Sequence, residues 1–227
     1  MVMKNKINQN NYQIVKSATY YFSVIITTYN RANLILRALN SLIAQTESDW
    51  EAIIVDDEST DKTYEKLAPY VKAYSKIRYI KQSHRGEAAA KNTGMRSSTG
   101  RFITFLDSDD EFDPFHLESR KAFLMQNTSV KFLYGGVKII GNHFVPDRFD
   151  YSKTIDLNDC IIGGTFFIKR NIAISLNGFS DILIGTDADF FERARNAGVK
   201  MMEITRPTYV YHHDTEDSIT NKIYPGL

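Results

Sequence analysis

A short apolar stretch that ends in a cluster of aspartates constrains the fold of this chain most. Residues 102–106 read FITFL, and the next four residues, DSDD, include three carboxylates. An apolar run of that length with aromatic and β-branched residues is typical of a buried strand. In an open α/β sheet, ligands bind at the carboxyl ends of the strands. The stretch therefore predicts a strand that delivers carboxylates to a ligand site, although an acidic loop or a helix cap would look the same in isolation.

Strands and helices are predicted to alternate over the first half of the chain. The predicted strands cover residues 21–28, 50–55, 77–80 and 102–106. Apolar residues at helical spacing follow the first three strands, over residues 35–43, 64–71 and 86–95. This alternation favours right-handed crossovers, and the continuous apolarity of the strands favours burial on both faces. We therefore predict an α/β fold with a Rossmann-like, mostly parallel central sheet and helices on both faces.

Several polar positions are predicted to set helix ends. Asn30 is a candidate N-cap for the first helix, and Asp113 with Pro114 is expected to begin a helix after the acidic cluster. Pro69 lies inside the second helical pattern and predicts a kink or an early stop. The C-terminal half is predicted to be mixed, because glycine-rich turns separate short apolar runs at residues 132–134, 137–140 and 165–168.

Length and composition limit the class of protein. The 227 residues are 43% hydrophobic, which supports a sizeable core. We expect a polar leader over residues 1–19 and one domain over residues 20–227. The balance of 28 basic and 27 acidic residues argues against nucleic-acid binding through bulk charge. A single cysteine, Cys160, and the absence of an apolar run of about 20 residues predict a cytoplasmic protein, with peripheral membrane contact left open.

Three predicted strands end in polar side chains. Thr27 lies at the end of the first strand and Tyr29 follows it, Asp57 follows the second, and the aspartates from 107 to 110 follow the fourth. A parallel sheet brings these ends to one edge, although they lie far apart in sequence. The segments VIITTYNR (24–31), VDDESTD (55–61), KNTG (91–94) and LDSDD (106–110) occur in this order, and together they resemble the inverting family 2 glycosyltransferases, which have the GT-A fold.

The resemblance covers roughly residues 20–215 and assigns roles to the nucleotide side. It implies a nucleotide half over about residues 20–112 and an acceptor half over about 113–215. Thr27 and Tyr29 match positions that line the nucleotide base, and Asp57 matches a residue that accepts a hydrogen bond from it. Arg85 lies in a loop that is expected to contact the donor.

The acidic cluster resembles the DxD motif of the family. The resemblance places Asp107 towards the ribose or the donor sugar, groups Ser108 with the donor-binding residues, and places Asp109 on Mn²⁺ or Mg²⁺, with Asp110 assisting. The metal would bridge the diphosphate and offset the charge on the departing nucleotide. A histidine near the C-terminus can be a further metal ligand in this family, and we favour His213 over His212, which points to the opposite face of a strand.

The resemblance also implies a general base. An inverting transfer needs a group that takes the proton from the acceptor hydroxyl as it attacks the anomeric carbon. Asp187 falls on the family's base position, at the start of a helix predicted over residues 186–197. Thr186 stands where the family usually has a glutamate. Asp187 and Asp189 could equally interact with the helix dipole, and for Asp189 we prefer this interpretation. The pair Gly163-Gly164 suits either close approach to a sugar or a tight turn.

The sequence thus predicts a metal-dependent inverting glycosyltransferase. It would move a sugar from a nucleotide-diphospho-sugar, with a UDP-sugar favoured, to a hydroxyl of a glycan or lipid-linked saccharide, as in polysaccharide biosynthesis. A nucleotide-sugar-binding module without turnover is the alternative. A sugar-nucleotide pyrophosphorylase is disfavoured, because the loop after the first strand contains no glycine.

Overall fold

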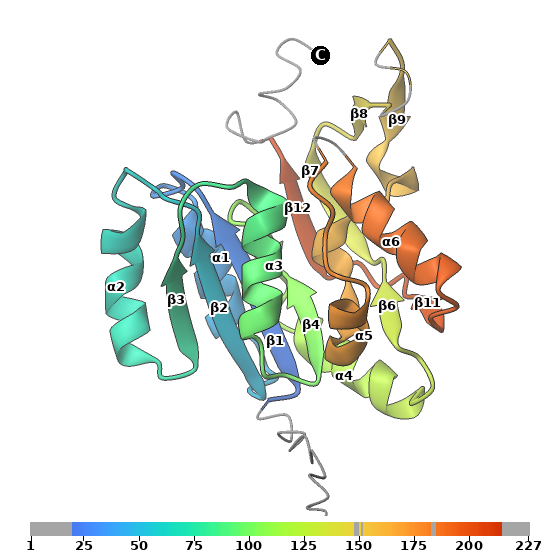
Figure 1. The fold of residues 1–227 in the computed structure, drawn as a ribbon, viewed down its shortest axis with the longest axis horizontal. Helices are drawn as coiled ribbons and strands as arrows, with labels where there is room; N and C mark the ends of the chain where they lie inside the picture. The colour runs from blue at the N-terminus through green and yellow to red at the C-terminus, as the bar shows by residue number, and fades with distance from the viewer. Residues whose placement is uncertain (1–19, 148–149, 151, 183–184, 215–227) are drawn as a thin grey trace, which may run out of the picture.

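The protein folds around one twisted central sheet (Figure 1). The structure is a computed structural model that describes residues 20–147, 150, 152–182 and 185–214. The predicted polar leader at residues 1–19 and the segment after residue 214 lie outside the described residues. Within the described residues, no helix combines the length and the apolar character that crossing a membrane requires.

Seven strands form the central sheet in the order β11-β6-β10-β4-β1-β2-β3. Their bounds are β1 Phe22–Thr28, β2 Trp50–Asp56, β3 Ile77–Lys81, β4 Phe102–Phe105, β6 Phe132–Tyr134, β10 Phe167–Lys169 and β11 Met201–Glu203. Every pairing is parallel except those of β10, which runs antiparallel to both β4 and β6. The predicted mostly parallel α/β sheet with a mixed C-terminal half is confirmed.

Helices cover both faces of this sheet, as the continuously apolar strands predict. The helices are α1 Ile35–Ile43, α2 Thr63–Ala73, α3 Glu87–Ser97, α4 His116–Gln126, α5 Arg170–Ser175 and α6 Thr186–Asn196. Alternate residues of β1 point to opposite faces. Val24 and Ile26 pack in a cluster with residues of α1, α2 and α4, whereas Ile25 packs with residues of α3, α5 and α6. Figure 1 shows α3 and α6 on the near side of the sheet.

A smaller sheet lies beside the carboxyl end of β4. It has the order β5-β12-β7, with β5 Glu111–Phe112, β7 Val137–Gly141 and β12 Tyr209–His213. A hairpin of β8 Phe144–Pro146 and β9 Thr154–Asp156 extends beyond it (Figure 1). Short 3-10 turns cover Leu157–Asp159 and Gly163–Thr165. The predicted strand at residues 165–168 therefore begins only at Phe167, because the glycine pair before it forms a 3-10 turn.

The predicted helices agree with the structure better than the residues predicted to begin or end them. Asn30 does not cap α1, which begins at Ile35. Its backbone is left-handed, with φ of 53°, and its side chain accepts hydrogen bonds from the backbone N–H groups of residues 60 and 61. Pro69 does not stop α2, which continues to Ala73. Asp113 does not cap α4 either, because its side chain accepts from the N–H of Phe115 and the helix begins one residue later.

Candidate functional site

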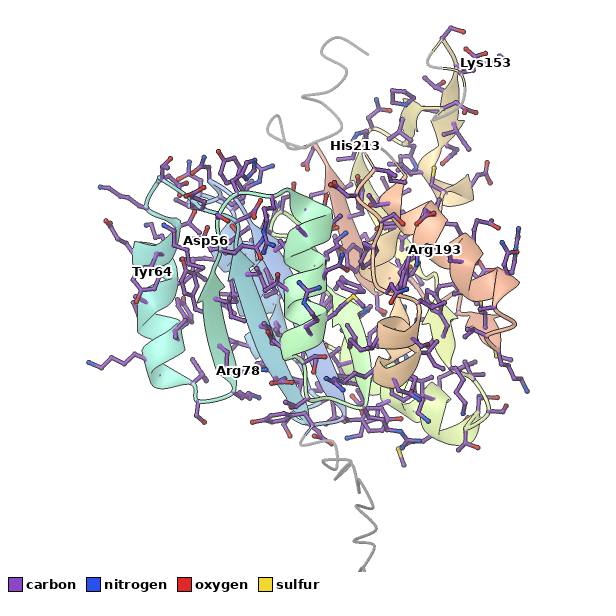
Figure 2. All side chains as sticks on the ribbon, viewed as in Figure 1. Asp56, Tyr64, Arg78, Lys153, Arg193 and His213 are labelled. Carbon is purple, nitrogen blue, oxygen red and sulfur yellow. The ribbon has the colours of Figure 1, made fainter. Side chains whose placement is uncertain are left out.

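The carboxyl ends of the parallel strands meet at one edge of the central sheet, as predicted. The N–H of Asp57 donates to the carbonyl of Thr28 at 2.9 Å, and the N–H of Leu106 donates to the carbonyl of Ile25 at 3.0 Å. In Figure 2, Asp56 lies near this edge, whereas Arg78, at the start of β3, lies at the other edge. The segments that follow β1, β2 and β4 therefore lie side by side.

Asp57 organises the loop between β3 and α3. Its carboxylate is almost fully buried and accepts hydrogen bonds from the backbone N–H groups of Arg85 and Gly86 at 2.8–3.2 Å. The amide of Gln82 donates to it at 2.7 Å, and Nδ1 of His84 lies 2.8 Å from its second oxygen. Because Gly86 is the N-cap of α3, this one carboxylate ties the end of β2 to the start of that helix.

An aromatic platform lies next to Asp57. The Tyr29 ring is 44% exposed and stacks on the His84 imidazole, with 4.3 Å between ring centroids and 25° between planes. Thr27, the next-to-last residue of β1, is partly buried. Arg85 is exposed, and its guanidinium donates to the side chain of Gln82 at 3.2 Å. The residues predicted to bind the base thus share one corner of the edge, where His84 covers the carboxylate of Asp57.

The aspartate cluster divides into two roles. Asp110 is buried, and its carboxylate accepts from the hydroxyl of Tyr209 at 2.6 Å and from the N–H of His212 at 2.8 Å. Asp110 therefore anchors β12 beneath the site. Asp107 keeps 26% of its side chain exposed, and burial of the rest raises its pKa to about 7 against the opposing effect of Lys91. Asp107 is consequently the carboxylate of this pair that faces solvent.

Asp109 lies beside two arginines. Burial raises the pKa of its carboxyl group, and the positive charges of Arg31 and Arg37 oppose that rise. The Arg37 guanidinium donates to the backbone carbonyl of Asp109, which fixes the turn from α1. Ser108, between the two aspartates, is 8% exposed. Arg31, Arg37 and Asp109 lie near the carboxyl edge of the sheet. Two positive charges and one carboxylate suit an anionic ligand that binds together with a metal cation.

A buried lysine joins the acidic cluster to the start of α6. Lys91 is 2% exposed, and its Nζ lies 2.6 Å from Glu87 Oε1, 3.4 Å from Asp187 Oδ1 and 3.8 Å from Asp107 Oδ1. Burial lowers the pKa of Lys91, but the carboxylates of Asp187, Glu87 and Asp107 outweigh it and hold that pKa well above its ordinary value. Asp107 and Asp187, which are distant in sequence, therefore flank one ammonium group.

The glycine pair packs against side chains of the site. Gly163 N–H donates to Asp187 Oδ2 at 3.0 Å, and a Cβ on Gly163 would overlap that carboxylate. A Cβ on Gly164 would overlap the phenol of Tyr209. Of the two sequence interpretations, the tight turn is the one seen, as a 3-10 turn. The absence of side chains here lets the backbone come within hydrogen-bonding distance of Asp187.

The structure also describes the surroundings of Asp189, His212 and His213. Asp189 pairs with Arg193 at 2.9 Å and accepts from Ser180, and the helix-dipole interaction preferred for it stays a prediction. Nε2 of His212 lies 2.7 Å from Glu111 Oε1. His213 is 5% exposed and shares a strand face with Tyr209; its Nδ1 contacts the carbonyl of Asn142, and its Nε2 has no partner among the described residues.

Among the residues that the structure brings to the site and that the sequence does not indicate are Lys91 and Tyr209. Lys91 lies in the KNTG segment, but no role was given to it. Its signal was a lysine one helical turn after Glu87 on an alanine-rich helix that must pack against the sheet. The sequence around Tyr209 indicates no role for it at the site. Its contact with the aspartate cluster depends on β12 pairing with β5, which the local sequence does not reveal.

Comparisons with known proteins agree with this geometry. A curated relative is the Escherichia coli UDP-Glc:alpha-D-GlcNAc-diphosphoundecaprenol beta-1,3-glucosyltransferase WfgD, which is 33% identical over 169 residues covering 71% of this chain and 64% of WfgD. Among solved structures, S. aureus TarS 1-349 in complex with UDP-GlcNAc aligns with a TM-score of 0.74 at 21% identity, covering 88% of this chain and 60% of the TarS 1-349 chain.

A second solved structure contains a nucleotide-sugar and a metal ion. The mannosyltransferase PcManGT from Pyrobaculum calidifontis, in complex with GDP-Man and Mn²⁺, aligns with a TM-score of 0.69 at 20% identity, covering 95% of this chain and 63% of PcManGT. The chain spans less than two thirds of the length of each of these three proteins. The structural likeness confirms the predicted GT-A fold. A family model described as "Glycosyl transferase family 2" matches residues 23–174, which are more than half of this chain. The chain therefore belongs to that family.

Proposed function

We propose that this chain is a metal-dependent inverting glycosyltransferase. It transfers a sugar from a nucleotide-diphospho-sugar, with a UDP-sugar favoured, to a hydroxyl of a glycan or a lipid-linked saccharide. The observation that carries the proposal is the meeting of Asp107 and Asp187 around Lys91. An inverting transfer needs a donor-side group and an acceptor-side base on either side of one carbon, and the approach of these two partly exposed carboxylates to one ammonium group supports assigning them to those roles.

The donor half is assigned to residues 20–112 and the acceptor half to residues 113–215. On the donor side, the Tyr29 ring provides a stacking surface for the base, and Asp57 provides the acceptor for a base N–H. Thr27, Arg85 and Ser108 complete the contacts around the nucleotide. Two findings support a UDP-sugar: WfgD is named for UDP-Glc, and TarS was solved with UDP-GlcNAc. WfgD is also named for a diphosphoundecaprenol-linked acceptor, which supports a lipid-linked saccharide.

A divalent cation, Mn²⁺ or Mg²⁺, fits the oxygen-rich donor set of this edge. The described residues contain no group of three or more His, Cys, Asp or Glu side chains that could enclose a metal by themselves. Hard cations of this kind are commonly held by one or two carboxylates together with substrate phosphates. Asp109 is the proposed carboxylate ligand, and His213, with its unpartnered buried Nε2, is the proposed second ligand. When bound, the cation would offset negative charge on the departing nucleotide.

In the proposed reaction, Asp187 accepts the proton of the acceptor hydroxyl as its oxygen attacks the anomeric carbon. The bond from that carbon to the diphosphate breaks, and the nucleotide leaves with both electrons. Asp107 orients the donor sugar, and Tyr209 with Asp110 keeps β12 against the acidic turn. Removing a general base typically slows a reaction by about 10²–10⁴-fold.

Donor binding is measured first, by thermal shift with UDP-glucose, UDP-N-acetylglucosamine and GDP-mannose, with and without Mn²⁺. A donor at a hundredfold excess over its dissociation constant should stabilise the fold by about 2.7 kcal/mol. Asp109→Ala should lose the Mn²⁺-dependent part of this stabilisation. A donor that binds equally well without metal would contradict the assignment of Asp109.

Transfer is measured next, with the donor that binds. Asp187→Asn should keep donor affinity and lose about 10²–10⁴-fold in turnover, since an amide does not take up the proton. Asp189→Asn is the matched control, because this carboxylate lies in the same helical turn and is paired with Arg193. Full turnover by Asp187→Asn would show that the base is another group. Binding of donor with no turnover by any acceptor would favour the non-catalytic alternative.

A further inference from the structure

We propose that Lys91 is a positioning residue for the transfer reaction, in which its ammonium group holds Asp187 and Asp107 at a fixed separation across the site. This inference rests on the function proposed above and extends it to a residue to which the family resemblance gave no role. The ammonium touches neither donor nor acceptor in this assignment. It acts through the two carboxylates.

Burial and geometry point to this role. Lys91 is among the most buried charged side chains of the described residues, at 2% exposure, and it lies on the face of α3 that packs against the sheet. Charged side chains are rarely buried in this way unless they are paired. The Lys91 side chain passes the rings of Phe105 and Phe179, whose centroids lie 5.9 and 5.2 Å from Nζ. The polar partners of this ammonium among the described residues are the carboxylates of Glu87, Asp107 and Asp187.

Electrostatics explain why a cation is needed at this point. Asp107 and Asp187 each expose only about a quarter of their side chain, at 26% and 27%. Two like charges in a partly buried site repel each other, and an opposite charge between them offsets that repulsion. Lysine suits the position, because its ammonium is a compact charge with three donors and can serve several carboxylates at once.

Both oxygens of Asp187 are held from opposite sides. Oδ1 lies 3.4 Å from Lys91 Nζ, and Oδ2 accepts the Gly163 N–H at 3.0 Å. With these two contacts the carboxylate plane is fixed, while the remaining lone pairs stay open to an acceptor hydroxyl. Loss of the Lys91 contact frees one oxygen and lets the carboxylate rotate about its last bond. A displacement of about 1 Å at a reacting group can cost about 10²-fold in rate.

A purely structural role for Lys91 predicts different behaviour. Glu87, four residues earlier on the same helix, is its nearest partner at 2.6 Å and would be the partner that matters. In that case replacement of Lys91 would lower stability without acting through Asp187. The two roles therefore differ in which carboxylate is coupled to Lys91, and a double-mutant cycle measures this difference.

The experiment measures UDP release from UDP-N-acetylglucosamine with Mn²⁺ and water as the acceptor, in the full chain. Lys91→Met should lower kcat by about a hundredfold while the donor KM changes less than kcat. Lys91→Arg keeps the charge with a longer, planar group, so it should retain more activity than Lys91→Met yet fall below the wild type. Lys66→Met, on the exposed surface of α2, is the control and should leave kcat unchanged.

The cycle with Asp187→Asn tests whether Lys91 acts through Asp187. The double variant Lys91→Met with Asp187→Asn should be no slower than Asp187→Asn alone, since the lysine has nothing left to position. Losses in kcat that multiply would overturn the proposal, and so would wild-type kcat in Lys91→Met. If instead Asp187→Asn itself keeps full turnover, the base assignment fails, which is a distinct result.

A measurement independent of turnover covers the case in which Lys91→Met is poorly folded. Urea unfolding of Lys91→Gln, which removes the charge but keeps a polar side chain, of Asp187→Asn and of their double variant gives the coupling between the two side chains. We expect a coupling of about fivefold in the folding equilibrium constant, within the range found for side chains in contact. Additive effects would show that the ion pair does not form, and would overturn the proposal.

Discussion

The contact between Gly163 and Asp187 leaves no room for a side chain at residue 163. Because a Cβ at Gly163 would overlap the carboxylate, Gly163→Ala must displace Asp187. The backbone of Gly163 is not in the left-handed region, so the substitution introduces little strain of its own. We expect Gly163→Ala to keep donor affinity and to lose about 10²-fold in kcat, measured as UDP release.

The control for this variant separates stability from turnover. Gly198 follows α6 with φ of +69°, and no atom lies within 4 Å of the place of its Cβ. Gly198→Ala should therefore cost about 1–2 kcal/mol of unfolding free energy through backbone strain, with kcat unchanged. Equal kcat in Gly163→Ala and the wild type would contradict the assigned contact between Gly163 and Asp187.

At the scale of one element, the loop from Gln82 to Gly86 places the His84 imidazole where the nucleotide base is expected to bind. His84 stacks on Tyr29 and reaches the carboxylate of Asp57, which are the two contacts proposed above for the nucleotide base. A nucleotide must displace His84 to gain them. We expect His84→Ala to tighten donor binding by about fivefold, the equivalent of one hydrogen bond of about 1 kcal/mol, measured by calorimetry.

Two further variants support or refute this interpretation of the loop. Tyr29→Ala removes the stacking surface and should weaken donor binding. His143→Ala changes an exposed histidine outside this edge and should leave donor binding unchanged. Weaker donor binding in His84→Ala would show that His84 contributes a contact to the nucleotide instead of competing with it.

Elements were predicted well where the sequence pattern is local, and poorly where partners are distant. The strands and helices of the first half follow from apolar runs, because burial on both faces leaves a continuous signal. The start of α1 could not be predicted from Asn30, since this residue bonds to the backbone after β2 instead of to the next helix. The convergence of Asp57 and Asp107 was predictable from parallel topology. The contacts made by Lys91 were not, because they depend on how α6 packs.

At the scale of the whole molecule, a buried histidine makes stability depend on pH. His116 is fully buried; Nδ1 lies 2.8 Å from the Thr208 hydroxyl, and Nε2 has no partner among the described residues. Burial, with a further contribution from Arg120, holds the pKa of His116 well below its ordinary 6.5. His116 therefore binds a proton near pH 6.5 in the unfolded chain, but stays neutral at that pH in the folded protein.

It follows that the contribution of His116 to the free energy of unfolding decreases as the pH is lowered below 6.5, whereas the raised pKa of Asp107 contributes in the opposite direction over this range. The contribution of one such group is about 1.4 kcal/mol per pH unit. His116→Asn should remove this contribution from the pH dependence of the free energy of unfolding. Urea unfolding of both proteins at pH 6.5 and at mildly acidic pH measures the difference. His143→Asn should keep the slope of the wild type. A slope that is the same in all three proteins would assign the acid sensitivity to other groups.

The strand β10 has a consequence for how the chain is made. It lies between β4 and β6, yet it follows both of them in sequence. Until residues 167–169 have left the ribosome, the FITF strand of β4 has an unpaired apolar edge, which is the kind of surface that recruits other strands and aggregates. Fragments cut before β10 should therefore aggregate during expression. Fragments that extend past it should have that edge sealed.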